Sequence, residues 1–237
     1  MIRIAVVLAL VLGVSATLTG LLFYTGIIRF NYPSLKSYPV RGIDISHHQR
    51  AIDWPKVAGQ GIQFAYIKAT EGGNHRDRRY TENWREAQKA GIVVGAYHFF
   101  TFCRSGREQA LNFIRTVPKQ NGVLPPAVDL EFGGNCQMAP GFDLRKELHD
   151  YRRAILSAYA RDPIFYVTPG LYRSGLVDAI ITNQLWFRNI YGKPQVNPAD
   201  RWIFWQYANR GRIPGINTYV DLNVFNGNTA NFEDLVK

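Results

Sequence analysis

Residues 126–131, Pro-Ala-Val-Asp-Leu-Glu, form a short apolar stretch that carries two acidic side chains near its end. Asp129 and Glu131 lie two residues apart, and residues with this spacing on a β-strand point to the same side of the sheet. Two carboxyl groups on the inner face of an apolar strand are poorly solvated, which raises the pKa of at least one of them. The stretch therefore predicts a strand that presents a carboxylic acid able to stay protonated near neutral pH.

Similar apolar runs recur along the chain and alternate with helical patterns. The predicted strands are residues 42–45, 63–68, 92–99, 126–131, 164–167, 185–187, 202–206 and 219–221. The predicted helices are residues 79–90, a segment that begins at Ser105, and residues 143–160. This alternation favours a parallel sheet, and about eight strands favour its closure. Because the last three strands leave little room for helices, the expected fold is α/β, an irregular β/α barrel with fewer helices on the C-terminal side.

Four acidic residues from distant parts of the chain stand at the ends of predicted strands. Asp44 ends the first strand and Asp221 ends the last, while Asp129 and Glu131 end the fourth. Reactive groups of a parallel barrel lie at the C-terminal ends of its strands, so these four carboxyl groups are expected to converge on one face. The alternative for Asp44 and for Asp221 is a structural role as a turn or helix-cap residue.

The composition indicates a globular chain with a basic surface. The 237 residues suffice for one sizeable domain, and a formal net charge of +10 attracts polyanions such as nucleic acid, anionic lipid or an acidic cell-wall polymer. No zinc-finger spacing, RNA-recognition signature or long basic helix accompanies this charge, so nucleic acid is not an expected partner. The basic residues Arg76, Arg78 and Arg79 are interpreted as part of a solvated face.

The histidines and cysteines predict neither a metal site nor a cofactor. His47, His48 and His98 lack a carboxylate at metalloenzyme spacing and are interpreted as hydrogen-bonded or cleft-lining side chains. Cys103 and Cys136 follow the third and fourth predicted strands. Because loops after neighbouring parallel strands emerge on the same face, we expect these cysteines to form a disulfide in an oxidising compartment.

The N-terminal segment has no charged residue between positions 4 and 28. A helix of this length crosses a bilayer core, whereas a cleaved secretory signal has a shorter apolar region of roughly 7–15 residues. Residues 1–29 are therefore interpreted as a membrane anchor, with a signal sequence cleaved near residues 14–16 as the alternative. Residues 30–39 are interpreted as a linker to a domain that spans residues 40–237.

Several short motifs, taken in order, resemble glycoside hydrolase family 25, the Chalaropsis-type lysozymes. The motifs lie at residues 42–49, 53–54, 64–72, 95–99, 129–131, 205–207 and 220–223. Each motif alone is weak, but the ordered set extends from Arg41 to about Gly227. The resemblance implies a flattened barrel of eight strands. It also implies cleavage of the β-1,4 bond between N-acetylmuramic acid and N-acetylglucosamine in peptidoglycan.

The same resemblance implies roles for the four acids. Glu131 matches the general acid, and Asp129 matches a residue that orients the substrate's own acetamido group as this group attacks the anomeric carbon. Asp44 and Asp221 match residues that hold the network and raise the pKa of Glu131.

The resemblance further implies which residues bind the sugar and where this chain differs. The expected substrate-binding residues are Tyr97, Tyr166, Trp205 and Gln206. In the family a small residue and then a tyrosine often follow the tryptophan of the sixth strand. Here residues 186–191 read Trp-Phe-Arg-Asn-Ile-Tyr, which is longer and introduces the cation Arg188. This segment predicts a different shape for one wall of the cleft.

The expected function is that of an active lysozyme with peptidoglycan as substrate. The alternatives are a non-catalytic peptidoglycan-binding protein on the same barrel, and a glycosidase for another N-acetylated polymer. For location, Arg29, Lys36 and Arg41 after the apolar segment favour a cytoplasmic domain. The substrate and the cysteine pair favour export, so we expect a single-pass protein of the cell inner membrane with its catalytic domain exported.

Overall fold

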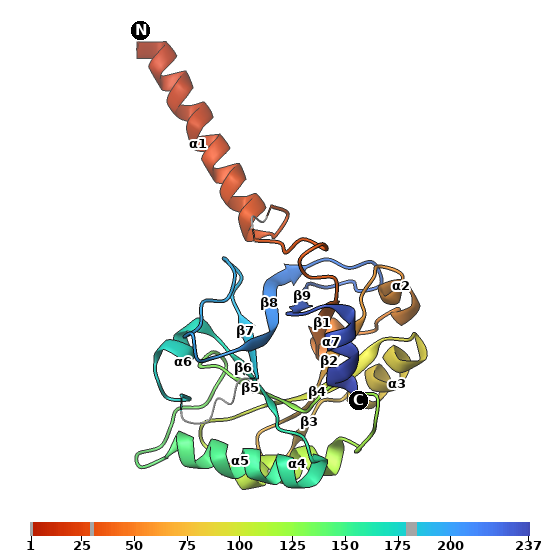
Figure 1. Ribbon diagram of the computed structural model, residues 1–237. Helices are drawn as coiled ribbons and strands as arrows, with labels where there is room; N and C mark the ends of the chain where they lie inside the picture. Colours follow the sequence, from red (N-terminus) through yellow and green to blue (C-terminus); the bar gives the residue numbers. More distant parts are fainter. Residues whose placement is uncertain (1, 29–30, 179–183) are drawn as a thin grey trace.

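A closed β-barrel with a long helix that projects away from it makes up the computed structural model (Figure 1). The structure describes residues 2–28, 31–178 and 184–237. The strands are β1 (Arg41–Ile45), β2 (Phe64–Glu71), β3 (His75–Arg76), β4 (Val93–Phe99), β5 (Ala127–Leu130), β6 (Ile164–Val167), β7 (Leu185–Arg188), β8 (Trp202–Gly211) and β9 (Val220–Phe225). Their order is β1-β9-β8-β7-β6-β5-β4-β2, and β2 pairs with β1 to close the ring, while the short β3 extends β2 outside it.

One strand of the ring runs against both of its neighbours. The other barrel strands pair in parallel, whereas β9 is antiparallel to β1 and to β8. Residues 212–219 alone connect β8 to β9, and a parallel connection needs a crossover of about a dozen residues or more. The expectation of a parallel last strand is wrong for this reason. The nine-stranded sheet less β3 is a closed barrel of eight strands, which confirms the predicted architecture.

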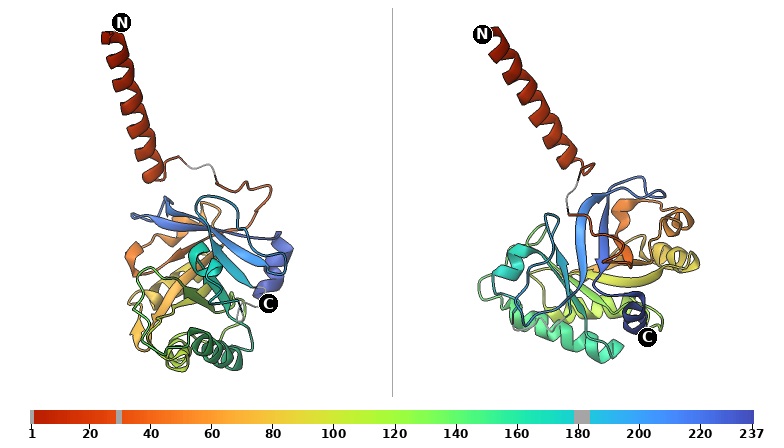
Figure 2. Two further views of the ribbon diagram at one scale, coloured as in Figure 1. Left: turned by 90° about the vertical axis from the view of Figure 1, so that its left-hand side faces the viewer. Right: turned by 45° about the horizontal axis from the view of Figure 1, so that its top comes forward.

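Helices cover the first half of the barrel more fully than the second. They are α2 (Trp54–Ala58), α3 (Tyr80–Lys89), α4 (Gly106–Thr116), α5 (Leu144–Tyr159), α6 (Pro169–Arg173), α7 (Thr229–Val236) and the 3-10 turn η1 (His47–Gln49). Both views of Figure 2 place α4 and α5 side by side along one flank. Between β6 and β9 the described residues contain one short helix, α6, which confirms a helix-poor C-terminal side.

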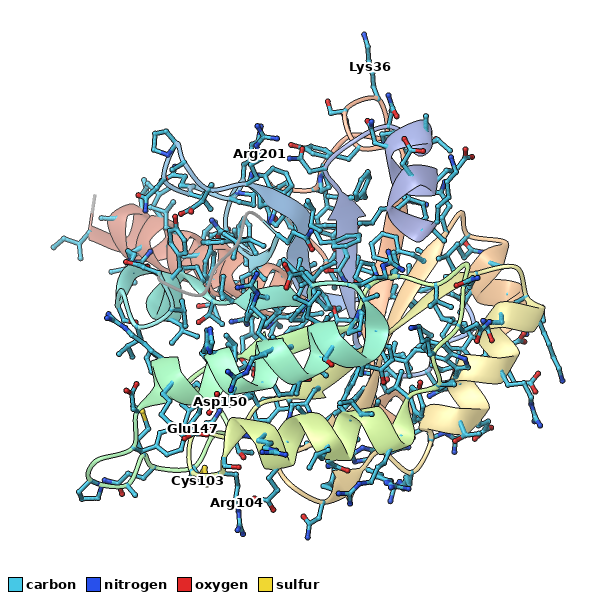
Figure 3. All side chains as sticks on the ribbon, turned by 60° about the horizontal axis from the view of Figure 1, so that its bottom comes forward. Lys36, Cys103, Arg104, Glu147, Asp150 and Arg201 are labelled. Atoms are coloured by element: carbon cyan, nitrogen blue, oxygen red, sulfur yellow. A yellow bond between two sulfur atoms is a disulfide. The ribbon has the colours of Figure 1, made fainter. Side chains whose placement is uncertain are left out.

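The paired helices α4 and α5 begin where the sequence predicts. The side chains of Ser105 and Asp143 accept hydrogen bonds of 3.1 Å from backbone N–H groups in the first turns of α4 and α5. The helices approach closely at Gly106, where a Cβ atom would lie 1.7 Å from the carbonyl oxygen of Glu147. Figure 3 looks onto this flank and labels Glu147 on α5. Glycine is therefore required at this contact between the two helices.

The interior of the barrel is filled by aromatic side chains. Phe64, Tyr66, Trp186 and Phe204 are almost completely buried there. The rings of Tyr66 and Trp186 stack with their centroids 4.7 Å apart. Because this packing closes the interior, polar chemistry is confined to the mouth of the barrel. A second apolar layer lies between the strands and the helices and includes the buried stripe Leu144, Leu148, Tyr151 and Ile155 of α5.

The N-terminal helix α1 (Ile2–Tyr24) projects away from the barrel and has its C-terminal end against β8 (Figures 1 and 2). None of its residues is buried, and it is long and apolar enough to cross a membrane. Its 23 residues correspond to about 34 Å of helix, which matches the hydrocarbon core of a bilayer. The predicted boundary between anchor and linker falls on residues 29 and 30, which lie outside the described residues.

The remainder of the predicted linker packs on the outside of the barrel. The side-chain amide of Asn31 donates a hydrogen bond of 2.8 Å to the backbone oxygen of Tyr207 in β8. The ring of Tyr38 contacts those of Trp202 and Trp205, with centroids 6.1 and 5.9 Å away. This segment therefore follows β8 toward the beginning of β1.

Candidate active site

A cleft of about 400 Å³ opens at the mouth of the barrel and collects all four predicted acids. Asp44 lies in β1, Asp129 lies in β5, and Glu131 follows β5 directly. The sequence pattern predicts that Asp221 ends the last strand, but in the structure it is the second residue of β9. Because β9 is antiparallel, its beginning lies at the same mouth as the ends of the parallel strands. Asp221 is there the cross-strand partner of Asp44.

Asp44 is held by two side-chain amides. Its Oδ2 accepts hydrogen bonds from Gln206 Nε2 at 2.9 Å and from Asn223 Nδ2 at 2.7 Å. Burial raises the pKa of Asp44, and the hydrogen bonds from Asn223 and Gln206 oppose this rise because they favour the charged carboxylate. Burial, followed by the charge of Asp44, holds the pKa of Asp221 well above its usual range. The interaction between the two carboxyl groups lowers the pKa of Asp44 and raises that of Asp221, so Asp221 is the more readily protonated of the pair.

Asp129 and Glu131 share the opposite side of the mouth. Burial, then the charges of Glu131 and Asp44, holds the pKa of Asp129 well above its usual range. Its Oδ1 atom is buried without a hydrogen-bond partner among the described residues. Burial also raises the pKa of Glu131, and the positive charges of Arg188 and Lys68 oppose it. Glu131 is only half-buried, so it combines a raised pKa with access to the open cleft.

Aromatic rings form the walls beside these acids. Tyr97 and Tyr166 line the cleft and pack edge-on against Trp186, with ring centroids 6.4 and 5.0 Å away. Burial holds the pKa of both tyrosines well above their usual range, so they remain neutral donors. Tyr166 donates a hydrogen bond of 3.1 Å to Gln206. Tyr166 and Gln206, two of the predicted sugar-binding residues, are thus part of the network that positions Asp44.

Trp205 differs from the expected substrate-binding role. Gln206 lines the cleft, but its neighbour Trp205 faces the outer apolar layer, because adjacent residues of a strand point to opposite faces. Its ring nitrogen donates to the backbone oxygen of Asn189 at 2.8 Å, and the side chain is 3% exposed. The expectation that Trp205 contacts substrate is corrected accordingly: it supports the loop after β7 from behind.

Two cations also reach the cleft. The sequence points to Arg188 as a change in one cleft wall, but it assigns a binding role to neither cation. Lys68 of β2 forms an ion pair of 2.6 Å with Glu71, and its ammonium lies 4.8 Å from the ring centre of Phe99. Arg188 is the last residue of β7, two positions after the inward-facing Trp186, and it lines the cleft. Arg188 lies two residues after Trp186 on the same strand, and this spacing is the sequence signal that places both side chains on the inner face of the barrel.

The histidines are engaged in hydrogen bonds or stand at the cleft wall. His98 is buried between Thr70 Oγ1 at 2.7 Å and Gln109 Oε1 at 3.1 Å, and burial lowers its pKa to about 3. His47 Nδ1 lies 2.8 Å from Asp77, and His48 lines the cleft. Within the described ranges, no group of three or more His, Cys, Asp or Glu side chains is arranged to hold a metal ion.

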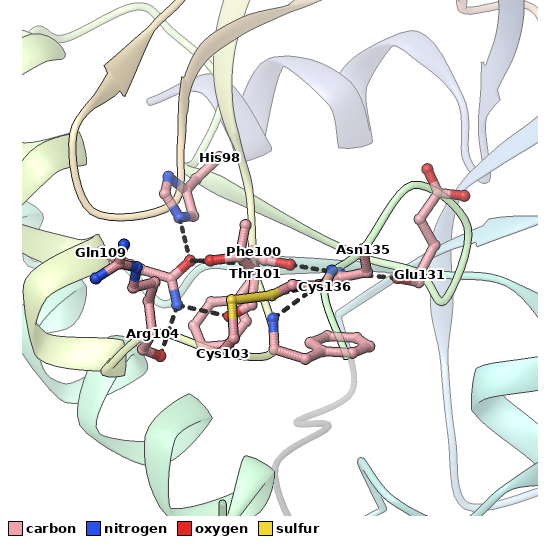
Figure 4. The surroundings of a disulfide bond; sticks show 10 residues. His98, Phe100, Thr101, Cys103, Arg104, Gln109, Glu131, Asn135 and Cys136 are labelled. Carbon is pink, nitrogen blue, oxygen red and sulfur yellow. Dashed lines mark hydrogen bonds between the residues drawn. A yellow bond between two sulfur atoms is a disulfide. The ribbon is translucent and has the colours of Figure 1, made fainter. Parts of the chain in front are cut away.

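A disulfide lies next to the end of β5, where Glu131 follows the strand (Figure 4). Cys103 and Cys136 are bonded with their Cα atoms 6.0 Å apart and join the loops that follow β4 and β5. Between these loops, Asn135 donates hydrogen bonds to the backbone oxygens of Phe100 at 2.8 Å and of Glu131 at 3.0 Å. The cross-link and this amide together fix the backbone from which Glu131 extends.

A barrel with paired carboxyl groups at its mouth and aromatic walls around them has the groups that glycoside hydrolysis requires. The sequence matches the family model of glycosyl hydrolases family 25 over residues 43–216, and the chain belongs to this family. The resemblance drawn from the ordered motifs is thereby confirmed.

Named relatives agree with this assignment. The chain is 34% identical over 203 residues to lysozyme M1 of Streptomyces globisporus, which covers 81% of this chain and 69% of that protein. A bacterial lysozyme structure from Streptomyces coelicolor superposes with a TM-score of 0.76 at 33% identity, over 83% of this chain and 96% of that one. A family 25 glycosyl hydrolase from Bacillus anthracis gives a TM-score of 0.74 at 35% identity, over 89% and 99% of the two chains.

Proposed function

We propose that this protein is a lysozyme that hydrolyses the β-1,4 bond between N-acetylmuramic acid and N-acetylglucosamine in peptidoglycan. The observation that carries the proposal is Glu131, a half-buried carboxyl group whose pKa is raised by burial and which opens into the cleft. Glycosidic cleavage requires such a group to protonate the leaving oxygen. Similarity to lysozymes from two Streptomyces species supports the substrate class.

In this proposal Asp129 acts on the substrate's acetamido group rather than on water. Its buried Oδ1 has no hydrogen-bond partner among the described residues, and its pKa is raised by burial and by the charge of Glu131. A bound acetamide N–H would satisfy that oxygen, and polarising the amide would make its carbonyl oxygen a better nucleophile. Glu131 then donates its proton as the acetamide attacks the anomeric carbon from the other side of the ring.

The Asp44 network holds this machinery in place. Because Asp44 accepts two amide hydrogen bonds on one oxygen, it is the acid of the cleft best stabilised in its charged form. Its charge is among the influences that raise the pKa of Asp129 and of Glu131. The charge of Asp44 therefore favours the protonated form of Glu131, the proton donor, without touching the reacting bond.

Mass spectrometry of fragments released from purified sacculi tests the function. Muramic acid at the new reducing ends would establish both the substrate and the bond. The matched control is Glu131→Gln, which preserves the shape of the side chain and removes its proton donor. Release of fragments from chitin but not from sacculi would favour a glycosidase for another N-acetylated polymer. Binding to sacculi without release of fragments would favour a non-catalytic role.

We further infer that α1 retains the enzyme in the membrane with the barrel exported. Arg210 in β8 donates a hydrogen bond of 2.9 Å to the backbone oxygen of Tyr24, and its guanidinium lies 3.9 Å from the centre of the Tyr24 ring. The end of the apolar helix is thus in contact with the catalytic domain. The full-length chain should remain in membranes washed at alkaline pH, and protease added to spheroplasts should digest the barrel. A shortened, soluble chain would indicate signal cleavage.

A further inference from the structure

Arg188 is a cation in the cleft that forms no ion pair with any of the described residues. It ends β7 beside Gln206 of β8, which is its cross-strand partner. Among residues 2–28, 31–178 and 184–237, no side chain forms an ion pair or a hydrogen bond with its guanidinium group. The side chain is half-buried, so its charge is directed into the cleft rather than dispersed in bulk solvent.

Lys68, the other cation of the cleft, is already engaged. Its ammonium is paired with Glu71 at 2.6 Å and lies over the ring of Phe99. In the order of the barrel strands, β2 and β7 each lie two strands away from β5, on opposite sides of it. Lys68 and Arg188 therefore flank Glu131 from opposite sides, and of the two only Arg188 is free to pair with an incoming group.

The surroundings of Arg188 determine what that group is. The mouth carries four acids, and Asp44 is the one best stabilised as a carboxylate, so an anionic substituent of the glycan would be repelled unless it met a cation. Arg188 already counters this acidity, since its charge opposes the rise in pKa of Glu131, Asp44 and Asp221 that burial produces. The planar guanidinium offers two parallel N–H donors, which match the two oxygens of a carboxylate. A neutral polymer of N-acetylglucosamine offers no partner for this fork.

We propose that Arg188 binds a free carboxylate of the glycan substrate and thereby sets a preference for anionic strands over neutral N-acetylated polymers. The inference rests on the proposed lysozyme function and adds a specificity residue to it. N-acetylmuramic acid differs from N-acetylglucosamine by a lactyl ether, whose carboxylate is free in strands without stem peptides and amide-bonded in strands that carry them. The peptide itself supplies carboxylates in the second case. Both sources present the same chemistry to Arg188.

The test compares wild type, Arg188→Ala and Arg188→Lys on three substrates. These are peptide-free glycan strands, the same strands with their lactyl carboxylates methyl-esterified, and intact peptidoglycan. Arg188→Ala should lower kcat/KM on free-acid strands about 10- to 100-fold more than on esterified strands, mainly through KM. Arg188→Lys should recover part of this difference, because it restores the charge but not the two-pronged geometry. Arg201→Ala is the control for net charge, since Arg201 is exposed on the surface (Figure 3).

Each outcome separates substrate binding from other effects. Loss of the Arg188 charge raises the pKa of Glu131 on every substrate, so rates are compared at the pH optimum of each variant. A difference confined to intact peptidoglycan supports the proposal and assigns the carboxylate to the peptide. Equal losses on free-acid and esterified strands would overturn the proposal and leave Arg188 as an electrostatic partner of Glu131. If wild type cleaves none of the three, the proposed function fails, and this inference fails with it.

Discussion

The indole nitrogen of Trp186 donates a hydrogen bond of 2.8 Å to Oδ1 of Asn223, and this contact fixes the direction of the Asn223 amide. An indole N–H only donates, so the amide oxygen must face Trp186 and the amide nitrogen must face away. That nitrogen donates to Asp44 at 2.7 Å. On the other side Tyr166 orients Gln206, which donates to the same oxygen of Asp44. Two aromatic donors of the cleft wall thus determine that Asp44 is an acceptor.

Replacing Asn223 with Ala should therefore shift the pH profile of the enzyme. Without the amide, Asp44 loses the first of the hydrogen bonds that hold its pKa down, so its pKa rises further. A higher pH is then needed to ionise Asp44, and the acid limb of the kcat/KM profile should move to higher pH. We expect a loss of about tenfold in rate at the acid side, in line with one lost hydrogen bond to a charged group. Trp186→Phe should move the limb in the same direction by less.

An unchanged acid limb in both variants would contradict the role of Asp44 as the ionised member of the cleft. The sequence motif at residues 220–223 already contains Asn223, two positions after Asp221, and hence on the same face of the strand. The motif does not show that Trp186 is the hydrogen-bond partner of Asn223. This contact depends on the strand order, which places β7 and β9 on either side of β8.

Replacing Glu131 with Gln should abolish hydrolysis while the barrel stays folded. Removal of a general acid lowers rates by about 10²–10⁴-fold, and loss of the proton donor to the leaving oxygen belongs at the upper end. Initial rates on purified sacculi measure the effect, and circular dichroism checks the fold. Turnover near that of wild type would assign the proton donor to another residue.

The strand patterns and the order of motifs are sufficient to predict the barrel and the convergence of Asp44, Asp129 and Glu131, because both follow from local alternation and from the C-terminal ends of strands. They were insufficient for Asp221, which reaches the mouth only because β9 is antiparallel. They also misplaced Trp205. It is adjacent to Gln206 in the motif, but the two side chains point to opposite faces of β8. Direction and facing depend on connection length and on pairing register, which are properties of the folded chain.

Asp129→Asn should stabilise the protein as it slows the reaction. Burial holds the folded-state pKa of Asp129 above its unfolded value. As the pH rises above the unfolded-state pKa, the unfolded chain releases the proton of Asp129 while the folded chain retains it. The free energy of unfolding therefore falls with rising pH. An uncharged amide removes this penalty. At pH 7 the melting temperature of Asp129→Asn should exceed that of wild type, by about 2–4 °C for each kcal/mol gained in the free energy of unfolding. The two melting temperatures should converge below the unfolded-state pKa of Asp129. A lower melting temperature across this range would show that Asp129 supports the fold.

Removing the disulfide should weaken both stability and catalysis. Cys103 and Cys136 are 33 residues apart, and a cross-link of this span contributes about 2–4 kcal/mol to the free energy of unfolding. The loop it restrains also carries Asn135, whose amide holds the backbone oxygen of Glu131. The double variant Cys103→Ser, Cys136→Ser should melt at lower temperature and show reduced kcat with little change in KM. Asn135→Ala, which keeps the cross-link, should reproduce the fall in kcat with a smaller loss of stability; if it does not, the disulfide acts on stability alone.

Retention of configuration is the expected stereochemistry. Asp129 and Glu131 extend from one strand and its end, so they approach the glycan from the same side. An inverting enzyme needs its base on the opposite side of the sugar ring, and a retaining enzyme with a carboxylate nucleophile needs that group beneath the anomeric carbon. Two acids on one strand suit instead a proton donor and a neighbour that steers the substrate's acetamide, which gives retention through two displacements. Proton NMR of the first product should therefore show the β-anomer, and Asp129→Asn should lower kcat steeply with little change in binding. An initial α-anomer would exclude substrate assistance and indicate a water activated from the far side, with Asp44 or Asp221 as its base.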